Sequence, residues 1–343
     1  MVYETHLIQN SKGEISMTDS LLSVRNLSIQ FENFSSTIHA VNGCSFELNR
    51  GEILGLVGES GCGKSLTSTA CLGLLPDNAI LNGSICLEGQ PLESLSAQEW
   101  ARVRGDDIAM IFQNPMTALN PYFTIEQQMA DIILAHRKIS RKQAKLEAIQ
   151  LLDMVHLPEP EQAVTKYPHQ FSGGQLQRIM IAIALSCEPK VLIADEPTTA
   201  LDVTIQAQII LLLRELAEKQ NISILFITHD LSVVASLCDR VAVMYAGTIV
   251  EQGPIDSLFN HPMHPYTKGL LNSVPAIGLT HELYAIPGSV PDMRTKPQGC
   301  AFASRCHAAT DLCLSAAPEA KQYNAHQVLC FHHQPPKQQK QIA

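Results

Sequence analysis

The loop from Gly58 to Ser65 constrains this chain more than any other feature of its sequence. Its sequence is Gly-Glu-Ser-Gly-Cys-Gly-Lys-Ser, and it lies between a candidate buried strand at 52–57 and a helical pattern at 66–75. Glycines allow consecutive backbone N–H groups to face phosphate oxygens, and a helix that begins at the loop adds its positive N-terminal dipole. The spacing predicts a nucleotide-binding α/β fold. We expect Lys64 to reach the β- and γ-phosphates and Ser65 to bind Mg²⁺.

Two carboxylates follow a second apolar run. Asp195 and Glu196 come directly after the strand expected at 191–194. The first carboxylate suits Mg²⁺ coordination through water, and the second is placed to polarise a water in line with the γ-phosphate. Alone, such a pair is more often part of a solvated loop or a helix cap. It gains its meaning from the phosphate loop upstream.

A small-residue segment precedes the helical run at 176–185. It comprises Phe171-Ser172-Gly173-Gly174-Gln175, and small residues at a helix start make an anion site from free N–H groups. One ATPase chain needs no second anion site, whereas a protein that sandwiches nucleotide between two subunits does. On this pentapeptide alone, plain capping of the helix by Ser172 is the simpler interpretation.

Strand and helix patterns alternate along most of the chain. An amphipathic helix is expected at 203–219, between buried strands at 191–194 and 222–228, and the pattern at 124–155 is helical. This alternation predicts an α/β core with a parallel sheet. The length of 343 residues favours two domains, and the composition changes near residue 255, after which prolines recur and four of the ten cysteines cluster. We therefore expect four parts: a flexible extension at 1–19, a nucleotide-binding domain at 20–255, a cysteine-containing C-terminal domain at 256–334, and a disordered tail at 335–343.

Charge and hydropathy exclude several classes of protein. Lys and Arg total 24 against 33 Asp and Glu, giving a net charge of −9 that disfavours nucleic acid as a partner. No apolar run approaches the roughly 18–20 residues that a membrane-spanning helix needs. The polar N-terminus has no signal-peptide core, so we expect a cytoplasmic protein whose start is Met1 or Met17.

Six motifs, taken in order, resemble those of ABC-type ATP-binding cassettes. They are the phosphate loop, Gln113, Ser172-Gly173-Gly174-Gln175, Asp195-Glu196, Ala200-Leu201-Asp202 and His229. The resemblance covers about residues 20–255. It implies a P-loop cassette with a mixed sheet core, an antiparallel β part and a helical subdomain at about 124–186.

The resemblance also implies a role for each motif residue. Gln113 would sense Mg²⁺ and a transmembrane partner, Asp202 would cross a dimer interface, and His229 would contact the γ-phosphate. Phe31 would stack on adenine, although a core residue at a strand end is nearly as good an interpretation. The implied catalytic residues are Glu196, His229, Gln113 and Lys64, and the implied Mg²⁺ ligands are Ser65, Gln113 and Asp195. The implied ATP contacts are Phe31, Gly58, Glu59, Ser60, Gly61, Cys62, Gly63, Lys64, Ser65, Leu66, Ser172, Gly173, Gly174, Gln175 and Asp202.

Finer motifs are similar to the ATP-binding subunits of bacterial dipeptide and oligopeptide importers, and most similar to their D-type subunit. These motifs are Phe112 to Pro121, Tyr167-Pro168-His169-Gln170, His264-Pro265-Tyr266-Thr267, Ile286-Pro287-Gly288, Gly299-Cys300-Ala301-Phe302 and Arg305-Cys306. Phe171 stands where the family usually has Leu, and Gln175 where this subfamily often has Met. The resemblance implies ATP-driven peptide import at the cytoplasmic face of the inner membrane, where the chain is peripheral. Its partners would be a distinct F-type ATP-binding subunit in a heterodimer, two transmembrane permease subunits and a periplasmic or extracellular peptide-binding protein.

The cysteines Cys300, Cys306, Cys313 and Cys330 lack the paired C-x₂₋₄-C spacing that structural zinc sites favour. Four thiolates at wider spacing can hold an iron–sulfur cluster. The resemblance implies a [4Fe–4S] cluster. Zinc, with His307 or His326 as a substitute ligand, and four free thiols are the alternatives. In the phosphate loop, Cys62 is expected to be open to oxidation or alkylation.

Three kinds of alternative to peptide import share some of these motifs: other cargoes, non-transport cassettes and a cassette without activity. The same ATPase could serve nickel, glutathione or cationic peptides, because the cargo is chosen by other chains. DNA-repair cassettes carry long insertions between the phosphate loop and the signature, and translation-factor cassettes occur in pairs; this chain has one cassette and a short insertion. A regulatory protein with a dead cassette is disfavoured by the intact Lys64, Asp195, Glu196 and His229.

Overall fold

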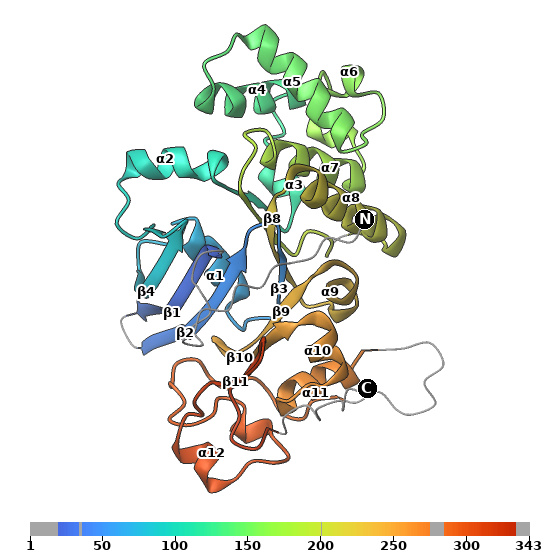
Figure 1. Cartoon of the computed structure of the whole chain (residues 1–343). Coiled ribbons are helices and arrows are strands. Elements are labelled where there is room, and N and C mark those ends of the chain that lie inside the picture. Colours follow the sequence, from blue (N-terminus) through green and yellow to red (C-terminus); the bar gives the residue numbers. More distant parts are fainter. Residues whose placement is uncertain (1–19, 34–35, 200, 275–284, 334–343) are drawn as a thin grey trace, which may run out of the picture.

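Two β-sheets organise the computed structural model, which describes residues 20–33, 36–199, 201–274 and 285–333 (Figure 1). The smaller sheet is antiparallel, with strand order β2-β1-β4-β5. Its strands are β1 (Ser20–Asn33), β2 (Ser36–Asn49), β4 (Ala79–Leu87) and β5 (Gln90–Pro91). The larger sheet has the order β11-β12-β10-β9-β3-β8-β7-β6. The predicted α/β fold, with a mixed core sheet and an antiparallel β part, is confirmed.

Five parallel strands form the centre of the larger sheet. They are β6 (Ile108–Ile111), β7 (Val191–Asp195), β8 (Ser223–Thr228), β3 (Ile53–Val57) and β9 (Arg240–Tyr245). Side chains alternate between the two faces of a strand, so Leu54 and Leu56 of β3 pack toward the smaller sheet, whereas Ile53 and Val57 pack toward the helices. Parallel strands buried on both faces carry the continuous apolar runs seen in the sequence.

Helices cover the larger sheet and connect its strands. They are α1 (Lys64–Cys71), α2 (Ala97–Asp106), α3 (Pro115–Ala118), α7 (Gly173–Ala184), α8 (Val203–Gln220) and α9 (Leu231–Leu237). The helix expected at 66–75 begins at Lys64 and ends earlier, at Cys71. The chain turns at Gly73, whose φ of +59° is a backbone conformation that glycine favours.

The segment predicted as a helical subdomain lies at one end of the molecule (Figure 1). It consists of α4 (Ile125–His136), α5 (Arg141–Met154), α6 (Pro160–Ala163), the 3₁₀ turn η1 (Pro168–Gln170) and α7. Helices α4 and α5 pack through Ala130, Ile133 and Ala144. Capping boxes start both helices, at Thr124 and at Ser140, which explains why the helical pattern divides into two helices.

The C-terminal segment lies at the opposite end and continues the larger sheet (Figure 1). The sequence predicts a separate domain after residue 255, yet β12 pairs antiparallel with β10 of the cassette. Strand β10 spans Thr248–Pro254, and the elements that follow it are α10 (Ile255–Asn260), α11 (Pro265–Asn272), η2 (Ala303–Arg305), α12 (Asp311–Ser315), β11 (Lys321–Tyr323) and β12 (His326–Val328). The predicted extension at 1–19 and tail at 335–343 lie outside the described residues.

Candidate nucleotide-binding site

The phosphate loop joins β3 to α1 and leaves the start of that helix open. Gly63 occupies the N-cap position with a φ of 103°, and no side chain among the described residues caps the first turn. The backbone N–H groups of that turn are thus available to an anion. At the other end of the loop, a Cβ on Gly58 would lie 2.1 Å from the carbonyl oxygen of Met244. Only glycine fits there without moving the backbone.

Lys64 is folded into the loop. Its Nζ donates hydrogen bonds to the carbonyl oxygens of Gly58 and Glu59, at 2.9 and 3.0 Å. The buried ammonium is therefore surrounded by acceptors in the place where phosphate oxygens would be expected. Cys62 lies 3.8 Å from the same Nζ and is only 1% exposed. Burial raises the pKa of the Cys62 thiol, although Lys64 opposes this. The expectation that Cys62 is open to oxidation or alkylation is wrong, since its thiol is both covered and held protonated.

Ser65 and Asp195 meet at the end of β7. The Ser65 hydroxyl donates a hydrogen bond of 3.1 Å to Oδ1 of Asp195, whose side chain is buried. Burial raises the pKa of Asp195, the hydrogen bond from Ser65 lowers it, and the neighbouring Glu196 raises it again. A hydroxyl and a carboxylate placed together beside the phosphate loop form a donor set that suits Mg²⁺.

Glu196 is held by three side chains. Its Oε2 accepts hydrogen bonds from Nε2 of Gln113 and from the hydroxyl of Thr199, both at 3.0 Å. Its Oε1 lies 3.3 Å from Nδ1 of His229. Gln113, Glu196 and His229 follow β6, β7 and β8, so the carboxyl ends of three parallel strands bring them together. The motifs predicted Gln113 and His229, whereas the contact from Thr199 has no signal in the sequence.

A cavity of about 360 Å³ lies between this cluster and the phosphate loop. Its lining includes Gly58, Glu59 and Ser60 on one side and Glu196 and His229 on the other. Glu196 itself adopts a left-handed backbone conformation, with φ of 47°, which turns its side chain out of the strand. The geometry places a carboxylate beside a cavity bordered by an anion-binding loop.

The remaining predicted ATP contacts do not line this cavity. Phe31 pairs with Ile38 and Ala79 in the smaller sheet and, like Leu66, packs against the core between the sheets. Ser172 and Gln175 form a capping box at the start of α7, and Asp202 caps α8 through the N–H groups of residues 204 and 205. Gly173 lies near the side chain of Leu201, which precedes α8, and Gly174 lies near that of Ile205 in the first turn of α8.

Two C-terminal residues contact the phosphate loop, and sequence reasoning gave neither of them this role. The Tyr266 hydroxyl accepts a hydrogen bond of 3.0 Å from the backbone N–H of Glu59. The Arg305 guanidinium contacts both carboxylate oxygens of Glu59, at 2.7 and 3.1 Å. These residues are separated from Glu59 by more than 200 positions, and nothing in their local pattern indicates a contact with the loop.

The four C-terminal cysteines line one small cavity, of about 20 Å³, together with Phe302 and His332. Burial, together with the smaller effect of the other three thiols, raises the pKa of Cys300 to about 11. Backbone hydrogen bonds from Phe302, Ala308 and His332 lower the pKa of Cys300, Cys306 and Cys330, respectively. Four sulfurs from distant positions thus converge, and three of them receive backbone hydrogen bonds.

The fold and the phosphate-loop site define an ABC-type ATP-binding cassette. The ABC transporter family model matches residues 41–199, and the model for the oligopeptide/dipeptide transporter C-terminal region matches residues 250–313. The dipeptide transport ATP-binding protein DppD of Bacillus subtilis is 49% identical over 317 residues, covering 91% of this chain and 95% of that protein. The oligopeptide transport ATP-binding protein OppD of Escherichia coli is 47% identical over 301 residues, covering 88% and 89%.

A solved cassette has the same fold. The dimeric cassette MJ0796, in a post-hydrolysis state bound to ADP and Pi, matches with a TM-score of 0.61 and 25% identity, covering 68% of this chain and 98% of that one. This chain therefore belongs to the family of ABC transporter ATP-binding proteins that includes the dipeptide and oligopeptide transport subunits. Its members are ATPases that use ATP and Mg²⁺. Among the described residues, no helix has the length and apolar character needed to cross a membrane.

Proposed function

We propose that this chain is the ATP-hydrolysing subunit that powers uptake of dipeptides or oligopeptides through a membrane transporter. The observation that carries the proposal is the Glu196 carboxylate, which is held by Gln113, Thr199 and His229 beside the phosphate-loop cavity. The cargo class is supported by the match to the oligopeptide/dipeptide transporter C-terminal region and by the names of the relatives.

ATP would bind with its phosphates on the open first turn of α1. The Lys64 ammonium would exchange its two carbonyl acceptors for β- and γ-phosphate oxygens. Ser65 and Asp195 would hold Mg²⁺, which supplies positive charge to the phosphates. The adenine would lie outside the cavity, where Phe31 is the aromatic that the family resemblance assigns to stacking.

Glu196 would act as the general base. Its carboxylate would accept a proton from the water that attacks the γ-phosphate, leaving ADP and phosphate as products. Gln113 and His229 bind different oxygens of this carboxylate, so they fix its plane before ATP arrives. His229 would then also reach the γ-phosphate, because its side chain lines the same cavity.

The second half of the ATP site would come from another subunit. Ser172 to Gln175 and Asp202 do not line this chain's own cavity, and MJ0796 is a dimer with ADP and Pi. We propose a heterodimer with a distinct F-type chain. The native mass of the complexes formed in MgATP tests the heterodimer. It is measured for the Glu196→Gln protein alone and for its mixture with the F-type chain. A stable two-subunit species only in the mixture supports the heterodimer, and one formed by this chain alone contradicts it.

The membrane partners would dock beside Gln113. Apolar side chains after β6 are exposed rather than packed: Phe112, Met116, Phe123 and Tyr122, the last of these 86% exposed. An apolar patch of this kind marks an interaction surface. Two permease subunits would cover it and place the chain at the cytoplasmic face of the inner membrane, with a peptide-binding protein on the other side. Binding of ATP would thereby be communicated through Gln113 to the permease.

Reconstituted uptake tests the proposal. The complete transporter, with its permease subunits and peptide-binding protein, is placed in vesicles with ATP at the face that carries this chain. Labelled dipeptides and oligopeptides should accumulate with wild-type protein and should not accumulate with Lys64→Ala. Accumulation of nickel or glutathione in place of peptides would support the alternative cargoes and contradict peptide import.

We propose further that Cys300, Cys306, Cys313 and Cys330 bind a [4Fe–4S] cluster. The four thiols share one cavity, and backbone hydrogen bonds toward sulfur are a feature that tunes such clusters. In a tetrahedral zinc site the sulfurs would lie about 3.8 Å apart. Among the described residues, no three of these sulfurs lie within 4.8 Å of one another. The sulfurs are thus spread more widely than one tetrahedral ion requires, and the cavity of about 20 Å³ must widen to admit a cluster.

Protein purified without oxygen tests the cluster. Iron and sulfide counts near four per chain, lost in Cys300→Ser and kept in Cys86→Ser, would support it. The control changes a cysteine of β4, outside the C-terminal cavity. Zinc alone, or no metal, would contradict the cluster and leave the ATPase assignment unaffected.

A further inference from the structure

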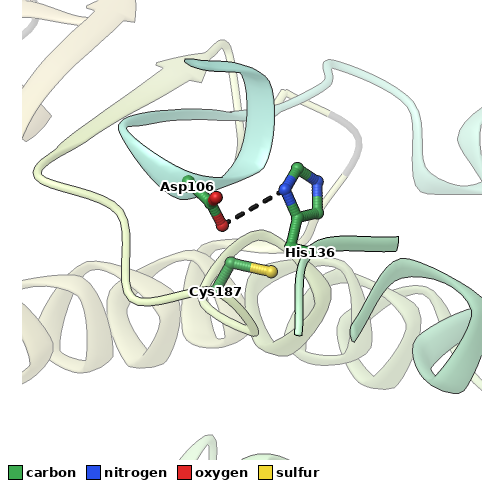
Figure 2. Close-up of side chains that lie close together, drawn as sticks. All are labelled: Asp106, His136 and Cys187. Carbon is green, nitrogen blue, oxygen red and sulfur yellow. Dashed lines mark ion pairs between the residues drawn. The ribbon is translucent and has the colours of Figure 1, made fainter. Parts of the chain in front are cut away.

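A second group of metal-ligating side chains lies away from the ATP site. Asp106 ends α2, His136 ends α4, and Cys187 follows α7. One ligand atom from each, a carboxylate oxygen, an imidazole nitrogen and a thiol sulfur, lies within 4.8 Å of the other two. Figure 2 shows the three side chains pointing toward one another, with a dashed line between His136 and Asp106. Nδ1 of His136 lies 3.2 Å from Oδ1 of Asp106.

The distances and the donor types suit one divalent transition metal ion. Zinc is bound by thiolate, imidazole and carboxylate at bond lengths that put tetrahedral nitrogen and oxygen ligands about 3.3 Å apart. Without a metal the two atoms contact each other directly as an ion pair, and their separation of 3.2 Å is close to this value. We propose that Asp106, His136 and Cys187 form a binding site for Zn²⁺ or a similar borderline-soft divalent cation. The partly exposed Asp106 leaves room for water as a fourth ligand.

The backbone around Asp106 is held in a shape that permits this approach. Helical geometry breaks at Arg104 and Gly105, where φ of Gly105 is 98°. A Cβ on Gly105 would lie 2.8 Å from Nε2 of His136, so the close packing of the imidazole requires glycine. The Arg104 guanidinium donates to the carbonyl oxygens of Leu72 and Gly73, both at 2.8 Å, and anchors the break.

The site is distinct from that of Mg²⁺ and ATP. Asp106 and Cys187 precede β6 and β7, whereas Gln113 and Asp195 lie at the other ends of these strands or beyond them. Of the three ligands, His136 comes from the helical subdomain and Asp106 from the core. A bound ion would therefore tie α4 to the core sheet, and it should stabilise the junction between them. This inference does not depend on which cargo the transporter carries.

Cobalt substitution tests the site on the full-length chain. Metal-free protein is titrated with Co²⁺, which reports a thiolate ligand by a charge-transfer band in the near ultraviolet and tetrahedral geometry by strong visible bands. Wild-type protein should bind one equivalent that Cys187→Ser and His136→Gln both lose and that Zn²⁺ displaces. Cys86→Ser is the matched cysteine control and should keep it. Cys300→Ser distinguishes this site from Co²⁺ binding by the C-terminal cysteines. The variant should still bind the equivalent that depends on Cys187 and His136.

The thermal midpoint gives a second readout. Zn²⁺ should raise the Tm of wild-type and Cys86→Ser proteins, and it should leave that of Cys187→Ser unchanged. Circular dichroism of the metal-free variants checks that each has folded. The same cobalt spectrum and stoichiometry in wild type, Cys187→Ser and His136→Gln would overturn the proposal, as would no binding of either metal at micromolar concentration.

Discussion

The Arg305 guanidinium binds the Glu59 carboxylate through both of its oxygens, at 2.7 and 3.1 Å, and so ties the C-terminal segment to the phosphate loop. Arg305 is 8% exposed and also lies over the rings of Tyr245 and Phe302. Paired hydrogen bonds between arginine and a carboxylate fix geometry as well as charge. Glu59 is the second residue of the loop that would receive the phosphates, so the C-terminal segment positions a part of the ATP site.

Replacing Arg305 by methionine should weaken ATP binding. The change leaves the partly buried Glu59 carboxylate without its cation and frees the start of the phosphate loop. We expect KM for ATP to rise by about tenfold, which corresponds to about 1.4 kcal/mol, with a smaller change in kcat. The residues that hold Glu196 are not touched. Steady-state ATPase kinetics measure both constants.

Arg294→Met is the matched control for this change. Arg294 also pairs with a carboxylate, that of Asp292, but the pair is exposed, and its hydrogen bonds run between these two residues rather than to the phosphate loop. Its loss should leave both kinetic constants unchanged. Arg305→Lys should be intermediate, because it keeps the charge and loses the paired geometry. An Arg305→Met protein with wild-type KM would show that the contact does not position the loop.

Gly58→Ala should abolish ATP binding at ordinary nucleotide concentrations. A Cβ at this position would lie 2.1 Å from the Met244 carbonyl oxygen, so either the loop or β9 must move. Gly89→Ala is a matched control, because Gly89 has positive φ and nothing within 4 Å of its Cβ position. That variant should lose roughly 1 kcal/mol of stability through backbone strain and keep its affinity. Equilibrium binding of a fluorescent ATP analogue compares the two, and equal affinity would count against the described loop packing.

His264 should make the stability depend on pH. Burial lowers the pKa of its side chain to about 4, and Lys268 lowers it while Glu251 raises it. Between pH 6.5 and 4 the unfolded chain binds a proton at His264 that the folded chain does not bind. The free energy of unfolding must therefore fall as the pH falls through this range, by roughly 3 kcal/mol from this group.

Urea unfolding at several pH values measures this effect. In His264→Asn the side chain no longer titrates, yet its amide oxygen can accept the hydrogen bond that Nδ1 receives from the Tyr266 N–H. The variant should lose less stability on acidification than wild type. His307→Asn, which changes an exposed histidine, should behave as wild type does. Equal slopes for His264→Asn and wild type would contradict the assignment.

Gln113, Glu196 and His229 could be predicted from the sequence because each belongs to a local motif, whereas the contact from Thr199 could not. The loop from Gly58 to Ser65 has the fixed spacing of a phosphate-binding motif. Asp195 ends one predicted strand and His229 follows another, so both residues are expected at the same edge of a parallel sheet. The helical pattern at 124–155 does not by itself show where α4 ends and α5 begins, although the Ser140 and Gln143 pair of the capping box marks the start of α5 in the sequence.

The contacts from the C-terminal segment could not be predicted. Arg305 contacts Glu59 across 246 positions, and β12, a strand of three residues, joins the sheet beside β10. Contacts between residues so far apart in the sequence depend on the tertiary fold of the whole chain, which local periodicity and motif spacing do not specify. The cysteine count and the prolines suggested a separate unit, whereas the structure packs that unit against the nucleotide site.

The most direct test of the account is the turnover of Glu196→Gln. The amide keeps the size of the side chain and cannot accept the proton, so MgATP should still bind while hydrolysis falls at least about 100-fold. Glu159→Gln is the matched control: Glu159 is exposed and has a similar left-handed backbone, with φ of 50° against 47° for Glu196. Its turnover should equal that of wild type. Near-normal hydrolysis by Glu196→Gln, with binding retained, would contradict the assignment of Glu196 as the base.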